Sequence, residues 1–156
     1  MSMASWISVV GSLNVDLTFR VPSFPAPGET LIAAEAVSSF GGKGGNQALA
    51  AKRAGAKVRM IGCLGDDEQA RQYRARLVEE GIDCSGVMST EGRTGVASIA
   101  LNRDGENTII VDPGANLQLT PCKVAELENL FRGSAVTLLQ LECPIEGIVK
   151  AAQLAR

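Results

Sequence analysis

The densest chemical signal in the sequence is a run of glycines that contains one lysine and ends in an asparagine, Gly41-Gly42-Lys43-Gly44-Gly45-Asn46. Glycines let backbone N–H groups approach a polar ligand closely, and the N-terminus of a following helix favours an anion or a hydroxyl oxygen. The alternative interpretation is a flexible turn that caps a helix, with Lys43 as an ordinary solvated charge. The run therefore marks either a ligand-binding loop or a structural turn.

The run fits neither of two common nucleotide-binding motifs. A Walker A loop requires Ser or Thr after its Gly-Lys pair, but Lys43 is followed by Gly44, and Val37 stands where the first glycine is required. A dinucleotide-binding GxGxxG motif that began at Gly42 would require Gly or Ala at the position of Gln47. We therefore exclude both types of phosphate loop.

A second candidate is Glu142, which follows an apolar run predicted to be a buried strand. In parallel α/β sheets, ligands bind beyond the carboxyl ends of the strands, so this position suits a binding residue. The alternative is a plain acidic residue near the N-terminus of a helix, just before Pro144.

Composition limits the chemistry that the chain can perform. Its 156 residues favour one domain, and 46% hydrophobic and 21% charged residues are ordinary for a soluble globular protein. The formal net charge of −2 gives no support to a nucleic-acid or anionic-membrane partner. The absence of histidine excludes Ser-His and Cys-His nucleophiles and histidine-based metal sites.

The four cysteines are isolated from one another, at Cys63, Cys84, Cys122 and Cys143. Zinc clusters need closely spaced pairs, so we predict no metal site and interpret all four as buried small apolar residues in a reducing compartment. No apolar run approaches the roughly 18 residues of a membrane span. We therefore predict a cytoplasmic protein that does not enter membranes.

Apolar runs and turn residues predict two kinds of segment. Buried strands are expected over 6–10, 58–64 and 136–141, and helices over 46–54, 66–80, 120–131 and 144–155. This alternation predicts a parallel α/β layer. Short strands without helices between them are expected over 17–21, 31–37, 96–101 and 108–111, with an Asp-Gly hairpin turn at 102–105. These segments predict a separate small antiparallel sheet.

The predicted parallel sheet is short of strands. Three parallel strands are fewer than an α/β sheet with both faces covered normally contains. The chain also ends on a helix that follows a strand, with no strand after it. We therefore expect an incomplete sheet, so that either another chain completes it or the sequence is a fragment.

Short motifs in the same order along the whole chain resemble those of the ribokinase (PfkB-type) family of sugar and nucleoside kinases. Residues 11–16 resemble the family's GSxNxD start, 25–30 its PxPGET turn, 41–48 its GGKGxNQA loop, 64–67 its xGxD segment and 141–144 its QLExP stretch. Residues 94–97 and 114–116 are also similar to the family. Gly45 is a departure, because the family commonly carries Ala there. The resemblance identifies the chain as the N-terminal portion of such a kinase.

The resemblance also implies a set of sugar-binding residues. In this family the Asn and Asp of the first motif bind sugar hydroxyls, and the glycine loop and the acid of the QLExP stretch bind the same sugar. The residues that match are Asn14, Asp16, Gly41, Gly42, Lys43, Asn46 and Glu142. Ala97 and Ile99 match a lid segment that faces the sugar. From the residues alone, the alternative interpretation of Asn14-Val15-Asp16 is a turn at the end of a strand.

The family's catalytic motif is missing from this chain. That motif, DTxGAGD, supplies the catalytic base and the anion hole for the transferred phosphoryl group, and no GAGD occurs here. The sites that the family uses for ATP, Mg²⁺ and a monovalent cation (K⁺) also lie mainly in the missing half. We therefore assign no catalytic residue and no metal ligand, and we predict that the 156-residue chain alone is inactive.

The resemblance further implies how the chain is divided. Residues 1–13, 38–93 and 112–156 match the α/β core, and 14–37 and 94–111 match a small β lid that covers the sugar and often pairs in a homodimer. The implied activity is ATP-dependent conversion of D-ribose to ribose 5-phosphate. The alternatives are a naturally truncated, non-catalytic sugar-binding or dimerising module, and a family kinase for another sugar or a nucleoside.

Overall fold

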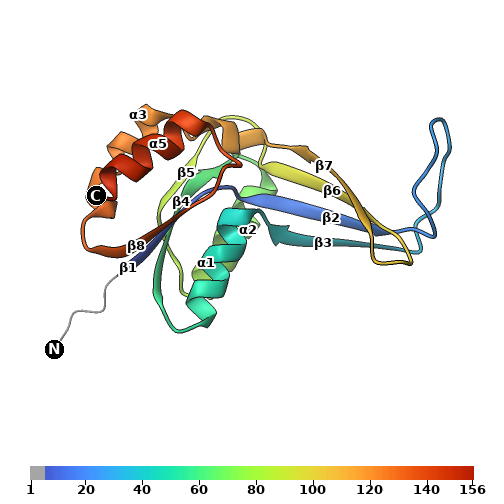
Figure 1. Cartoon of the computed structure of the whole chain (residues 1–156), viewed down its shortest axis with the longest axis horizontal. Coiled ribbons are helices and arrows are strands. Elements are labelled where there is room, and N and C mark those ends of the chain that lie inside the picture. Colours follow the sequence, from blue (N-terminus) through green and yellow to red (C-terminus); the bar gives the residue numbers. More distant parts are fainter. Residues whose placement is uncertain (1–5) are drawn as a thin grey trace.

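The computed structural model describes residues 6–156, which form an α/β layer and a second sheet that extends away from it (Figure 1). The strands of the first sheet, in spatial order, are β5 (Asp83–Ser89), β4 (Lys57–Leu64), β1 (Trp6–Val10) and β8 (Ser134–Leu139). All neighbouring pairs are parallel, which confirms the predicted α/β class.

Two strands of this sheet differ from the prediction. We did not predict β5, because its sequence is mostly polar and only Gly86 and Val87 are buried. We placed β8 two residues too late, because the apolar run continues past the strand to Leu141, which is exposed. The first sheet therefore has four strands rather than three within residues 6–156.

Helices cover both faces of the first sheet (Figure 1). On one face lie α1 (Lys43–Arg53) and α2 (Glu68–Glu79), and on the other lie α3 (Pro121–Glu126), α4 (Glu128–Phe131) and α5 (Ile145–Leu154). Side chains alternate along each strand, so Val9 packs toward α1 and α2 while Val10 packs toward α3 and α5. The sheet thus separates two hydrophobic cores.

Two predicted helices differ in detail. Helix α1 begins at Lys43 rather than at Asn46, because Gly42 has φ of 82° and turns the chain from a strand directly into the helix. The predicted helix over 120–131 is interrupted at Leu127 and forms α3 and α4. The predicted acidic start of α2 is confirmed, since the Asp67 carboxylate accepts a hydrogen bond from the Ala70 amide at 2.8 Å.

The second sheet contains β3 (Glu35–Gly41), β2 (Asn14–Arg20), β6 (Gly95–Leu101) and β7 (Asn107–Asp112), in that spatial order. Strands β2 and β6 run parallel, whereas the two outer pairs are antiparallel. Our prediction of a wholly antiparallel lid was therefore wrong, because β2 and β6 both leave the core in the same direction. Strand β3 also extends beyond residue 37, the predicted limit of the first lid segment.

Asp67 and Thr94 join the second sheet to the α/β layer. The Thr94 backbone N–H and hydroxyl donate to the two Asp67 carboxylate oxygens, each at 2.7 Å. Burial acts to raise the pKa of Asp67, but the hydrogen bonds from Thr94 and Ala70 hold it below its usual value. The residue that caps α2 therefore also anchors the start of β6.

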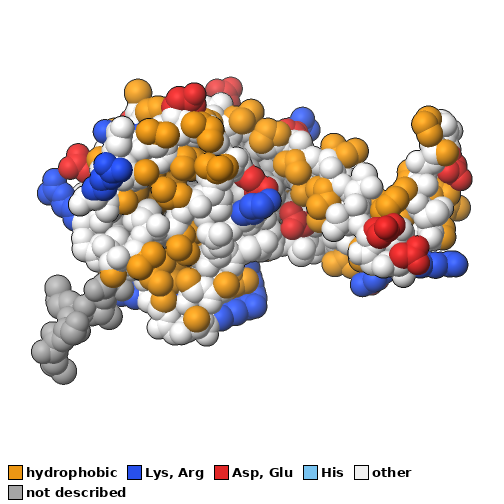
Figure 2. Space-filling model, in the orientation of Figure 1, with side chains coloured by type: hydrophobic (Ala, Val, Ile, Leu, Met, Phe, Trp, Pro, Cys, Tyr) orange, Lys and Arg blue, Asp and Glu red, His pale blue; other side chains and the backbone are white. Residues whose placement is uncertain are grey.

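Exposed hydrophobic side chains gather over α5 and β8 (Figure 2). They include Val136, Leu141, Ile145 and Val149. Strand β8 is an edge strand of the first sheet, so part of its backbone is not paired within residues 6–156. An exposed apolar edge of this kind is a surface on which another chain segment can pack.

Two of the cysteines are not buried as predicted. Cys63 and Cys143 are buried, but Cys84 is half-buried and Cys122 is exposed on α3. All four are free thiols in the part of the chain that the structure describes. Within residues 6–156, no helix has both the length and the apolar character needed to cross a membrane.

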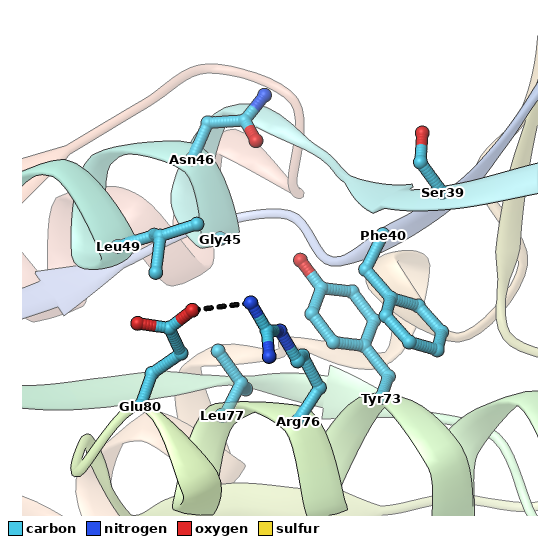
Figure 3. A pocket seen from close by; sticks show the side chains of 9 residues that line it. All are labelled: Ser39, Phe40, Gly45, Asn46, Leu49, Tyr73, Arg76, Leu77 and Glu80. Atoms are coloured by element: carbon cyan, nitrogen blue, oxygen red, sulfur yellow. Dashed lines mark hydrogen bonds and ion pairs between the residues drawn. The ribbon is translucent and has the colours of Figure 1, made fainter.

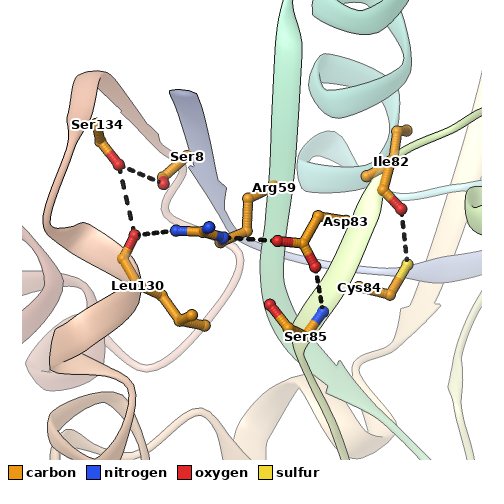
Figure 4. Close-up of polar contacts among 8 residues, drawn as sticks. All are labelled: Ser8, Arg59, Ile82, Asp83, Cys84, Ser85, Leu130 and Ser134. Carbon is orange, nitrogen blue, oxygen red and sulfur yellow. Dashed lines mark hydrogen bonds and ion pairs between the residues drawn. The ribbon is translucent and has the colours of Figure 1, made fainter. Parts of the chain in front are cut away.

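A polar network links the amino-terminal parts of the four parallel strands of the first sheet (Figure 4). The Arg59 guanidinium donates to Asp83 Oδ2 at 2.8 Å and to the Leu130 carbonyl at 2.5 Å. It also lies over the Trp6 ring, with Cζ 4.3 Å from the ring centroid. Arg59 thus connects β4 with β5 and α4. Only 11% of its side chain is exposed, so these contacts are partly shielded from solvent.

We expect Arg59→Met to lower the free energy of unfolding by about 2 kcal/mol, because it leaves Asp83 and the Leu130 carbonyl without their partner. Arg71→Met is the matched control, since Arg71 pairs with Glu68 on the exposed surface of α2. We expect a loss of at most about 0.5 kcal/mol from the control. Urea denaturation of both variants measures the difference, and equal losses would contradict the structural role of Arg59.

Candidate functional site

The two sheets meet beyond the carboxyl ends of β1 and β8, where the structure has a hollow of about 220 Å³. The residues that line it are Asn14, Asp16, Gly42, Lys43, Asn46, Ala97, Ile99, Ile109, Val111 and Glu142. The hollow thus brings together every predicted site residue except Gly41, which lies behind Asp16.

The strand directions explain this convergence. Glu142 follows β8 and Asn14 follows the turn after β1, and the carboxyl ends of these parallel strands lie at the same edge of the sheet. Asp16 lies opposite Ala97 in the parallel β2–β6 pair, so both side chains lie on one face of the second sheet.

Ile109 and Val111 form an apolar wall that we did not predict as part of the site. They lie opposite Ile99 and Ala97, respectively, in the antiparallel β6–β7 pair. The alternation of strand side chains places all four on the same face. The predicted hairpin at 102–105 contained enough information to find them, because its turn sets this register.

Glu142 is already engaged in an ion pair. One carboxylate oxygen, Oε2, accepts hydrogen bonds from the Ser12 hydroxyl at 2.8 Å and the Lys43 amide at 3.4 Å, while Oε1 pairs with the Lys43 ammonium group. Burial acts to raise the pKa of Glu142, but the hydrogen bonds from Lys43 and Ser12 lower it overall. Glu142 does not cap α5, and Lys43 is not an isolated surface charge.

The pKa of Asp16 is shifted in the opposite direction from that of Glu142. Burial is the main cause that raises its pKa, and the negative charge of Glu142 adds to it. Within residues 6–156 no side chain is hydrogen-bonded to its carboxylate, which faces the hollow. Asp16 is therefore an acceptor that is available to a ligand.

Close backbone approach explains the first two glycines of the loop. A Cβ atom at Gly41 would collide with the Asp16 carboxylate, whereas one at Gly42 would lie 2.7 Å from a backbone atom, the Ser12 carbonyl oxygen. Gly42 also has a φ of 82°, which side chains rarely tolerate. The glycines thus let the loop reach the end of β1 and the start of β2.

Asn116, in the short 3-10 helix Gly114–Gln118, contacts the site and is a residue that we did not single out. It is buried, accepts a hydrogen bond from the Leu13 amide at 2.8 Å, and donates to Asn14 Oδ1 at 2.8 Å. Because Asn14 Oδ1 already accepts this hydrogen bond, the NH₂ group of Asn14 remains to donate to a ligand. The only sequence signal was the short segment 114–116, which resembled the family without indicating a role.

The hollow therefore combines polar groups on one side with an apolar wall on the other. A carboxylate, an amide NH₂ group and an ammonium group suit a small molecule with several hydroxyl groups. Among the described residues, no group of three or more His, Cys, Asp or Glu side chains is placed to hold a metal ion.

Comparison with known proteins assigns the class. The family profile described as pfkB family carbohydrate kinase matches residues 5–156. Ribokinase from Haemophilus influenzae is 39% identical over 155 residues, which cover 99% of this chain and 51% of that protein. The chain therefore belongs to the pfkB family of carbohydrate kinases.

Solved structures support the same assignment. A ribokinase from Thermotoga maritima has a TM-score of 0.86 and 37% identity, covering 96% of this chain and 49% of that one. Ribokinase from Arabidopsis thaliana, solved with ribose and ATP, has a TM-score of 0.84 and 30% identity, covering 98% and 50%. The chain spans about half the length of the relatives it matches, and its resemblance to the N-terminal portion of ribokinases is confirmed.

We expect Asp16→Asn to stabilise the protein at neutral pH, because it removes a partly buried charge that Glu142 repels. A raised carboxyl pKa in the folded state favours folding below the unfolded value near 3.8, and this contribution is lost as the pH rises through the folded pKa. The gain from the substitution should therefore appear at neutral pH and vanish in acid. Thermal unfolding of the wild type and the variant, at neutral pH and in acid below pH 3.8, measures the gain in stability. A gain that is independent of pH would contradict this explanation.

Proposed function

We propose that this chain forms the sugar-binding half of an ATP-dependent ribokinase, which converts D-ribose to ribose 5-phosphate. The observation that carries the proposal is the hollow in which Asn14, Asp16, Lys43 and Glu142 converge between the two sheets. The Arabidopsis relative, whose structure contains ribose and ATP, supports ribose as the acceptor and ATP as the donor.

Each polar residue has a distinct role in this proposal. The Asp16 carboxylate accepts hydrogen bonds from adjacent sugar hydroxyls, and the free NH₂ group of Asn14 donates to a sugar oxygen. Lys43 and Glu142 form a preorganised pair whose remaining donors and acceptors face the sugar. The amide of Gly42 and the side chain of Asn46 complete the polar side, and Gly41, which does not line the hollow, lies against the Asp16 carboxylate.

The apolar wall has a different role. Ala97 and Ile99, with Ile109 and Val111 beside them, cover the carbon face of the sugar and exclude water. Strands β3, β2, β6 and β7 thus act as the lid, and the α/β layer around the first sheet acts as the core. Exposed apolar residues on one face of the lid, Val37 and Ile109 with Val111, support pairing of two lids in a homodimer.

We assign the chemical step to residues outside this chain. ATP supplies the phosphoryl group when it is bound, and the base that accepts the hydroxyl proton comes from the other half of the kinase, together with the sites for Mg²⁺ and K⁺. Asp16 binds hydroxyls and is not that base. The exposed apolar surface over α5 and β8 suits packing of the other half. The free thiols support a cytoplasmic location for the assembled enzyme.

The hollow also favours a second candidate function, a sugar-binding module without catalysis. All the residues to which we assign sugar binding lie within this chain, as a sugar-binding module would require. The two candidates agree on ribose binding and differ only in whether the chain works as part of a longer kinase.

We expect the chain to bind D-ribose, and we expect Asp16→Asn to weaken the affinity about tenfold, because a charged acceptor is lost. Isothermal titration calorimetry measures both. Asp104→Asn is the matched control, since Asp104 lies in the exposed hairpin turn of the lid away from the hollow. Equal affinities of wild type and Asp16→Asn would contradict the assigned role, and absence of ribose binding by the wild-type chain would contradict the proposed site.

We expect no ribose-dependent formation of ADP when the purified chain is incubated with ATP, Mg²⁺, K⁺ and ribose, because the chain lacks the catalytic motif. A coupled assay for ADP measures this, with the full-length Haemophilus influenzae ribokinase as positive control. Turnover by the pure chain would overturn the assignment of the base to the other half.

A further inference from the structure

Tyr73 of α2 contacts the glycine loop, residues 41–46, but does not line the hollow. Its side chain is 3% exposed and stacks on Phe40, with ring centroids 4.7 Å apart. Its hydroxyl donates to the carbonyl oxygen of Gly41, at the end of β3. Figure 3 shows the ring beside Phe40, with the hydroxyl directed toward the start of α1. The only tyrosine in the chain is therefore bonded to the loop residue that supports Asp16.

Gly45 of α1 provides the space for this hydroxyl. A Cβ atom at position 45 would collide with the Tyr73 hydroxyl oxygen, whereas the nearest ring carbon, Cζ, is 3.1 Å away and Leu13 Cδ2 is 3.3 Å away. Gly45 lies within a helix, where Ala is the better helix former. The glycine is thus explained by the phenolic oxygen and not by the backbone conformation.

The contact connects three parts of the site. Gly41 lies against the Asp16 carboxylate, and Gly42 turns the chain into α1. The Gly45 amide in turn donates to the Ser12 carbonyl at 3.1 Å, which docks α1 on the end of β1. Burial raises the pKa of Tyr73, and the charge of Asp16 adds to it, so the hydroxyl keeps its proton at neutral pH.

We propose that Tyr73 is a positioning residue for sugar binding: its hydroxyl holds the Gly41 carbonyl, and so fixes Asp16 and the first turn of α1, with Gly45 as its required neighbour. This inference rests on the proposed function, because it concerns the affinity of the same hollow for ribose. Tyr73 does not line the hollow and does not touch the sugar itself.

The first test compares Tyr73→Phe with Thr90→Val. Both variants lose one buried hydroxyl that donates to a backbone carbonyl, Gly41 in the first case and Leu64 in the second. We expect both to unfold at a lower urea concentration. At a temperature where both are folded, only Tyr73→Phe should bind ribose more weakly, by about tenfold in calorimetry. Equal affinities of the wild type and both variants would overturn the positioning role.

A double-mutant cycle tests the pairing with Gly45. Gly45→Ala alone should be strongly destabilised, because the methyl group meets the phenolic oxygen. In Gly45→Ala/Tyr73→Phe the oxygen is absent, so the added methyl group should cost little and the variant should unfold close to Tyr73→Phe. If the losses from the two single substitutions add, the proposed pairing is wrong.

A readout without sugar separates this inference from the proposed function. Amide hydrogen exchange of Gly45 and Asn46 reports the docking of α1, and we expect it to be about tenfold faster in Tyr73→Phe than in wild type, while exchange in β4 changes little. If the wild-type chain does not bind ribose, the proposed function fails, but faster exchange still supports the positioning role. Unchanged exchange overturns that role whether or not ribose binds.

Discussion

The backbone turns at Gly42 closer to the Ser12 carbonyl and the Asn14 amide than a side chain would permit, and the rest of the site depends on this approach. It lets β3 pair with β2 as far as Asn14, and it lets α1 begin at once with Lys43. Lys43 can then reach Glu142 at the end of β8, and Asp16 can lie against Gly41. The α/β layer and the lid are thus joined by backbone contact, and the polar residues follow from it.

Two carboxylates of similar chemistry reach the hollow in different states because their neighbours differ. Glu142 is neutralised by Lys43 and hydrogen-bonded by Ser12, so its charge is part of the folded structure. Asp16 keeps an open carboxylate that burial and Glu142 both disfavour. An unpaired, partly buried charge costs stability, and such costs persist where a ligand will satisfy the group. Under the proposed function, Asp16 is the open acceptor for the sugar, whereas Glu142 meets the same sugar as part of an ion pair that is already formed.

How much of this was predictable depended on whether the signal was local. Strands β1 and β4 were predicted because their apolar runs are continuous, and the convergence of Asn14 and Glu142 follows from the geometry of parallel strands. Strand β5 was missed because a polar edge strand leaves little pattern, and β2 was not expected to pair in parallel with β6, some 80 residues later. Asn116 and Tyr73 were missed because their hydrogen bonds join segments distant in the chain.

In the proposed kinase, the hollow that binds the sugar is separate from the apolar surface over α5 and β8 on which the other half would pack. Its described walls come from the lid strands, the start of α1 and the ends of β1 and β8, and all of them are held by contacts within this chain. The apolar surface over α5 and β8 lies outside these contacts. A polar site that is satisfied by local hydrogen bonds can be preorganised before that surface is covered. In the proposed kinase, covering this surface would add the groups that carry out phosphoryl transfer without rebuilding the groups that hold the acceptor.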